Sequence, residues 1–194
     1  MNYSRRELKD LAVAWLALGL AFGLLLSPIS ATRLDVVVSP EFAVLFAVSL
    51  VTAGVGFLGH ELAHKAVAVH FGQHAEFRAD YGMLLLAIAG GLAGFLFAAP
   101  GAVHHAGRIT NRQRGLVALA GPVANLAMAG VFWALTPISA IASYGVLINV
   151  LLAGFNMLPF GPLDGNTVRK WSLGVYVAVA VPSILLALRL LGFV

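Results

Sequence analysis

The sequence contains no cysteine, and charged residues make up only 10% of its 194 residues. The absence of cysteine excludes disulfide bonds and thiolate metal sites, so any metal would need histidine and carboxylate ligands. Soluble domains carry about 25% charged residues, and this chain has too few polar side chains to cover a water-exposed surface. Its 60% share of apolar residues also excludes a disordered chain.

The sequence instead contains long apolar runs, which predict an all-α polytopic membrane protein. A spanning helix needs about 20 mostly apolar residues. Five segments meet this need, at 11–29, at 42–59 with a helical continuation to about 71, and at 115–136, 138–158 and 171–191. The first is expected to be an uncleaved helix, because its apolar run is long for a signal peptide. A shorter apolar segment at 83–99 is rich in glycine and ends before Pro100.

The second apolar segment continues into three ionisable residues, His60, Glu61 and His64. Such residues are energetically costly inside a membrane and therefore indicate function. They form the H-E-x-x-H pattern, in which two histidines on one helix face can bind a single zinc ion. Glu61 can then accept a proton from the water that attacks a peptide bond. The alternative is a polar helix end that water solvates.

A catalytic zinc ion needs a third protein ligand, and the sequence offers His70 and Asp164. His70 would complete a longer zinc pattern, but Val67 occupies the position where that pattern needs a glycine to turn the chain. In a continuous helix His70 points away from the other two histidines. Asp164 is the only acidic residue after Asp80 and lies where prolines break a membrane helix. Irregular backbone at that depth lines a cavity or is buried, which suits a metal ligand, although an ordinary interfacial aspartate is the alternative.

With these residues identified, the chain resembles the site-2 protease family of intramembrane zinc metalloproteases. Three motifs match in order: G-H-E-L-A-H at 59–64, A-G-P-V-A-N at 120–125 and N-M-L-P-F-G-P-L-D-G at 156–165. The resemblance implies a single protease domain over 1–194 with its core at 41–165. Many members of the family carry a PDZ or CBS regulatory domain, and no segment here is long enough for either.

The resemblance also implies a role for each matching residue. One zinc ion per chain would be bound by His60, His64 and Asp164. Glu61 would be the general base. Asn156 would stabilise the oxyanion or hold substrate, and Asn125 is a second candidate for the same region. Preorganised amide donors suit this role, while hydrogen bonding between helices is the alternative for both asparagines.

The position of Asp164 predicts the membrane topology. If 83–99 crossed the membrane, the two following helices would leave Asp164 on the side opposite His60 and His64. If this segment dips in and returns, Asp164 reaches the same side, and most arginines and lysines fall there too. The positive-inside rule makes that side the cytosol. We therefore expect about five spans plus a re-entrant or hairpin element in the cell membrane, with the N-terminus and the active site toward the cytosol.

These expectations describe an intramembrane zinc endopeptidase. Its partners would be the transmembrane helix of a substrate protein and the lipid bilayer. The formal charge of +4 is assigned to topology and not to nucleic-acid binding, and nothing in the sequence sets an oligomeric state. One alternative is a non-catalytic pseudoprotease or adaptor that binds membrane helices. Another is a metal transporter or sensor, which would need polar residues along a path through the bilayer.

Overall fold

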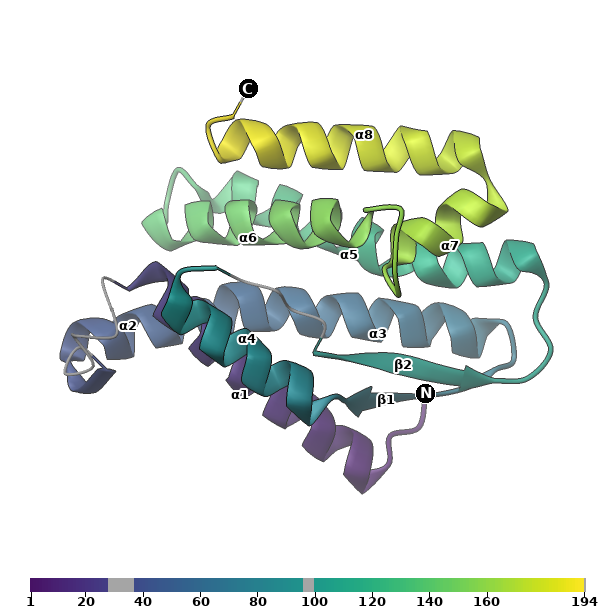
Figure 1. The fold of residues 1–194 in the computed structure, drawn as a ribbon, viewed down its shortest axis with the longest axis horizontal. Coiled ribbons are helices and arrows are strands. Elements are labelled where there is room, and N and C mark those ends of the chain that lie inside the picture. Colours follow the sequence, from purple (N-terminus) through teal and green to yellow (C-terminus); the bar gives the residue numbers. More distant parts are fainter. Residues whose placement is uncertain (28–36, 96–99, 194) are drawn as a thin grey trace. The chain divides into compact units, whose positions relative to one another are not determined.

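The computed structural model describes residues 1–27, 37–95 and 100–193 (Figure 1). The elements in chain order are α1 (Arg5–Leu26), α2 (Pro40–Ser49), the π-helical turn η2 (Leu50–Gly54), α3 (Val55–His70), β1 (His74–Ala79), α4 (Tyr81–Ala93), β2 (Gly101–Ala106), α5 (Asn111–Leu135), α6 (Ala140–Asn156), α7 (Asp164–Trp171) and α8 (Leu173–Leu190). Contacts divide the chain into two compact units. Unit 1 contains residues 59–75 and 105–194, and unit 2 contains residues 2–58 and 76–104.

The described chain has four helices that are long and apolar enough to cross a membrane: Arg5–Leu26, Pro40–His70, Asn111–Leu135 and Leu173–Leu190. They agree with the predicted all-α membrane protein. The second of them joins α2, η2 and α3 into 31 continuous residues, in agreement with the predicted helical continuation of 42–59 to about 71. The predicted span 138–158 corresponds to α6, which has only 17 residues because prolines lie close to both of its ends. The count of five spans stays a prediction.

Two features were not predicted from the sequence. The first is the two-stranded sheet of β1 and β2. The second is α7, a separate short helix that ends at Trp171, inside the range predicted for the last span. The helix breaks at Ser172, whose backbone is extended and whose hydroxyl accepts a hydrogen bond from Val175 to cap α8. The predicted end of the first helix, at 29, lies outside the described residues.

In unit 2, two buried carboxylates of α1 hold strand β1. Glu7 Oε1 accepts a hydrogen bond from the Phe77 N–H at 3.0 Å, and Asp10 Oδ2 accepts one from the Ala79 N–H at 3.4 Å. Alternate N–H groups on one edge of the strand therefore find acceptors one helical turn apart. Asp10 also accepts a hydrogen bond from the Tyr81 hydroxyl at 2.8 Å, which ties the start of α4 to the same helix.

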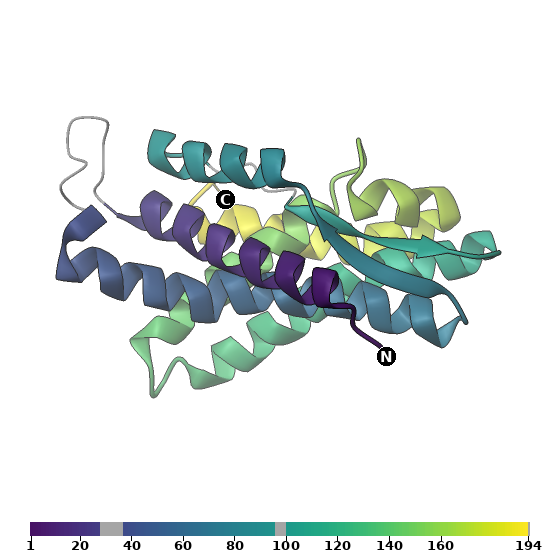
Figure 2. The same cartoon turned by 90° about the horizontal axis from the view of Figure 1, so that it is seen from below.

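The segment that contains α4 begins at Asp80 and ends at Pro100, and these two ends lie together. The Asp80 N–H donates to the Pro100 carbonyl at 3.0 Å, so the two ends of the segment meet. Between them α4 has 13 residues, or about 20 Å of helix, which is shorter than the ~30 Å hydrocarbon core of a bilayer. Figure 2 shows α4 lying along α1. The described ends of the segment therefore lie together, and the re-entrant or hairpin element stays a prediction.

Unit 1 contains α5, α6, α7 and α8 packed on one another. Contacts join α5 to α6 and α7, and join α8 to α6 and α7, and Figure 1 shows α6 and α8 running side by side. A buried cluster at this junction consists of Ala118, Met157, Val168 and Ala180. Trp171 packs against this cluster, and the missing side chain of Gly115 leaves room for its ring. This packing fixes α7, which begins with Asp164, on α5.

Candidate metal centre

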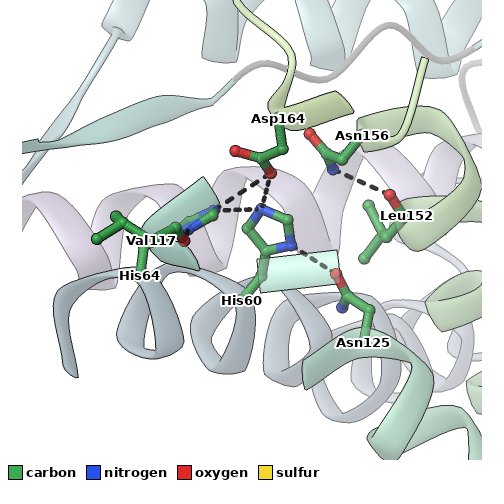
Figure 3. A network of polar contacts seen from close by, with 7 residues as sticks. All are labelled: His60, His64, Val117, Asn125, Leu152, Asn156 and Asp164. Carbon is green, nitrogen blue, oxygen red and sulfur yellow. Dashed lines mark hydrogen bonds and ion pairs between the residues drawn. The ribbon is translucent and has the colours of Figure 1, made fainter. Parts of the chain in front are cut away.

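Three of the predicted site residues lie together in unit 1: His60, His64 and Asp164 (Figure 3). Asp164 Oδ2 is 3.2 Å from His60 Nε2 and 3.3 Å from His64 Nε2, and the two Nε2 atoms are 2.9 Å apart. Both histidines are buried, and Asp164 is partly buried. The alternative third ligand, His70, is exposed at the end of α3 and is not part of this cluster.

The α6–α7 connection brings Asp164 to the histidines. Pro159 and Pro162 keep this segment from continuing α6, so the chain turns before α7 begins. Gly165 allows a tight reversal, since a Cβ atom there would lie 2.2 Å from the Met157 carbonyl oxygen. Asp164 is the first residue of α7, where a carboxylate interacts favourably with the helix dipole.

The Nδ1 nitrogen of each imidazole has a hydrogen-bond partner outside the cluster. His64 Nδ1 lies 2.7 Å from the Val117 carbonyl oxygen, and His60 Nδ1 lies 2.6 Å from Asn125 Oδ1. Both partners are oxygen acceptors, so each Nδ1 carries a hydrogen and donates it. In a neutral imidazole the remaining nitrogen then has a lone pair. The Nε2 lone pairs of both histidines are therefore available on the side where Asp164 lies.

The chemistry of this donor set fits a metal cation. Two Nε2 lone pairs and a carboxylate oxygen converge, and they repel one another unless a proton or a cation lies among them. Burial tends to raise the pKa of Asp164, whereas protonated His64 and His60 imidazoles beside it would lower that pKa to about 2. A metal cation among these atoms would favour the ionised carboxylate in the same way. Two histidines and a carboxylate are a ligand set of catalytic zinc, which keeps a further position open.

Glu61 lies next to this cluster on α3. Its side chain is buried, with 7% of the residue exposed. Within the described chain, its Oε2 atom has no hydrogen-bond partner. A buried, unpaired carboxylate oxygen is costly, so a polar group that binds at this position would satisfy it. The sequence predicted that this group is the attacking water.

The two predicted asparagines occupy different positions around the cluster. Asn125 lies behind His60, and its Nδ2 donates to Asn149 Oδ1 at 3.0 Å, so both ends of its amide are engaged. Asn156 ends α6 and donates from Nδ2 to the Leu152 carbonyl at 2.9 Å (Figure 3). This bond uses one of the two hydrogens on that nitrogen. The catalytic roles of both asparagines stay predictions.

A comparison with curated proteins establishes the family. The chain is 38% identical over 193 residues to a protein of Methanocaldococcus jannaschii named "Putative zinc metalloprotease MJ0611", with 94% of this chain and 93% of that protein covered. The chain belongs to this zinc metalloprotease family. No family model and no solved structure matches it. The membership supports the predicted metalloprotease class and implies zinc as the ion.

In this zinc metalloprotease, Gly121 lets α5 approach the two imidazoles. A Cβ atom at this position would lie 2.4 Å from His64 Nε2 and 2.5 Å from His60 Nε2. The next residue, Pro122, lacks the N–H that would bond the Ala118 carbonyl four residues earlier, so α5 has one internal hydrogen bond fewer at this point. The contact of Val117 could not be predicted from the sequence, because it is made by a backbone carbonyl, which any residue type has.

We expect Gly121→Ala to weaken zinc binding by about 10-fold or more, because the new methyl group would displace both imidazoles. Zinc affinity would be measured by chelator competition on the detergent-purified protein. Gly130→Ala is the matched control, since it changes the same helix at a position with open space around the glycine. Equal zinc affinity in folded Gly121→Ala and wild-type protein would contradict the placement of the ion against α5.

Proposed function

We propose that this protein is an intramembrane zinc metalloendopeptidase of the site-2 protease type. It would hydrolyse peptide bonds within or next to the transmembrane helices of other membrane proteins. The observation that carries this proposal is that two histidines and the buried Glu61, all on a continuous apolar helix of 31 residues, lie together with the aspartate that begins α7. A helix of that length and hydropathy can cross a bilayer, so the site would lie at the depth of a substrate helix.

Each residue of the site has a defined task in this reaction. Three side chains would hold the zinc ion: His60, His64 and Asp164. Zinc in this position would supply a Lewis acid that polarises a carbonyl and lowers the pKa of water. Glu61 would take a proton from the attacking water and return it to the leaving amine. Asn156 would donate a hydrogen bond to the oxygen that gains negative charge.

The geometry of the α4 segment supports the proposed topology. Since the ends of this segment meet at Asp80 and Pro100, it returns the chain to the side that it left. Two further helices, α5 and α6, then bring Asp164 back to that side. In this topology the metal site lies toward the cytosol, in agreement with the distribution of basic residues. A substrate helix would have to unwind locally there, because helical peptide groups are already hydrogen-bonded.

The proposal predicts zinc-dependent cleavage of a membrane helix. The purified protein should contain one zinc ion per chain and should cut a model transmembrane helix that contains a helix-breaking residue. Removing zinc with a chelator should abolish the cut, and adding zinc should restore it. The control substrate is an unstructured water-soluble peptide with the same residues around the cut.

Three outcomes would contradict parts of this proposal. Bound zinc without cleavage of any membrane helix would favour the adaptor. Cleavage that survives the loss of zinc would exclude the metalloprotease mechanism. Cleavage of the soluble peptide alone would exclude an intramembrane substrate.

A further inference from the structure

Asn149 is connected to the metal site although it is neither a predicted ligand nor a predicted catalytic group. It lies on α6 in unit 1 and is fully buried. Its Oδ1 accepts a hydrogen bond from Asn125 Nδ2 at 3.0 Å, and its Nδ2 donates to the Gly145 carbonyl at 2.9 Å. Asn125 Oδ1 in turn lies 2.6 Å from His60 Nδ1 (Figure 3). A continuous line of hydrogen bonds therefore runs from the backbone of α6 to a histidine of the site.

The backbone carbonyl of Gly145 fixes the direction of every bond in this line. A carbonyl only accepts, so Asn149 must turn its NH₂ group toward Gly145 and its oxygen toward Asn125. Asn125 must then turn its own NH₂ group toward Asn149 and its oxygen toward His60. That oxygen requires a hydrogen on His60 Nδ1. The lone pair of the neutral imidazole is therefore on Nε2, which faces His64 and Asp164.

We propose that Asn149 is a positioning residue that, through Asn125, fixes the tautomer His60 needs to bind zinc. This inference rests on the zinc site of the proposed function. Without Asn149, the Asn125 amide can rotate and present its NH₂ group to His60 Nδ1. The imidazole hydrogen then moves to Nε2 and occupies the ligand position. His64 does not depend on such a line, because its Nδ1 donates directly to the backbone of Val117.

The first test measures the zinc affinity of Asn149→Leu by chelator competition. We expect a loss of about 10-fold, the lower end of the range for partners that orient metal ligands. Ser183→Ala is the matched control, since this buried serine makes the same kind of bond to the carbonyl four residues earlier and should not affect zinc. Asn149→Asp retains an acceptor for Asn125 Nδ2 and should restore most of the affinity. The same affinity in Asn149→Leu and in wild-type protein would overturn the inference.

A double-mutant cycle shows whether Asn149 acts through Asn125. If it does, adding Asn149→Leu to Asn125→Ala should cause no further loss of zinc affinity. Additive losses would mean that Asn149 affects only the general stability of unit 1, and would overturn the proposal. Wild-type protein that binds no zinc would instead refute the proposed function. If Asn149→Leu does not fold, the test is made with Asn149→Asp. A loss of zinc affinity in Asn149→Asp as large as that in Asn125→Ala would contradict the line of hydrogen bonds.

Discussion

Replacing Glu61 with glutamine is expected to abolish peptide hydrolysis and to leave zinc binding intact. Glutamine has nearly the same shape as glutamate but cannot accept a proton from water at neutral pH. General-base catalysis contributes about 10²–10⁴-fold to a rate, so the initial rate of cleavage should fall by at least 100-fold. Zinc binding should persist because Glu61 is not one of the three residues of the metal cluster.

The control for this variant is Glu41→Gln, which removes an exposed carboxylate from the first turn of the same continuous helix. Cleavage rate and zinc content would be measured on the same preparations of all three proteins. A Glu61→Gln protein that cleaves at the wild-type rate would refute the assignment of the general base. A variant that loses both zinc and activity would show that Glu61 acts on the metal itself.

The three residues of the candidate metal centre were predictable because their signals are local or specific. His60 and His64 lie one turn apart on one helix, so the helix alone places their side chains on a common face. Asp164 was predictable for a different reason, since it is an isolated acid between a broken apolar helix and a glycine. The structure brings it within 3.3 Å of both Nε2 atoms, as the third-ligand hypothesis requires.

The contacts that orient the histidines were not predictable in the same way. The resemblance implied a place near substrate for Asn125, which stays a prediction, but it did not reveal the contact of Asn125 with His60 Nδ1. Asn149 stands in a segment assigned to a membrane span and carries no motif of its own. Its partner is set by the packing of α5 on α6, and packing between helices is a tertiary property that sequence periodicity does not reveal. A buried amide in an apolar helix is nevertheless a signal that a hydrogen-bond partner exists.

The secondary structure, too, depends partly on local sequence signals and partly on contacts between segments that are distant in sequence. The helix starts at Ser39 and Thr110 follow from side chains that cap the next turn. Strand β1 also had a local signal, since its six residues alternate polar and apolar side chains and its apolar residues Ala75 and Phe77 are buried. A run of six residues does not fix its own partners, and β1 is held by β2 and by the buried carboxylates of Glu7 and Asp10 on α1, which are distant in sequence.

Replacing Asp164 with alanine is the test with the largest expected effect on zinc. This change removes a ligand and not only a partner that orients one, so zinc affinity should fall by more than roughly 100-fold. Hydrolysis should be lost at ordinary zinc concentrations. The fold should survive, because an acidic residue in the first turn of a helix contributes only about 0.3–1 kcal/mol.

Two further variants make the Asp164→Ala result decisive. Asn166→Ala removes an exposed hydrogen bond from Asn166 Nδ2 to the Gly161 carbonyl and thus disturbs the same turn without touching the ligand atoms. It should bind zinc as the wild-type protein does, which separates loss of a ligand from disruption of the turn. His70→Ala should also keep its zinc, because His70 is exposed at the end of α3. Undiminished zinc binding in Asp164→Ala together with a loss in His70→Ala would reverse the assignment of the third ligand. In that outcome Asp164 would not need to lie on the same side of the membrane as His60. The main argument for a re-entrant α4 would then be lost.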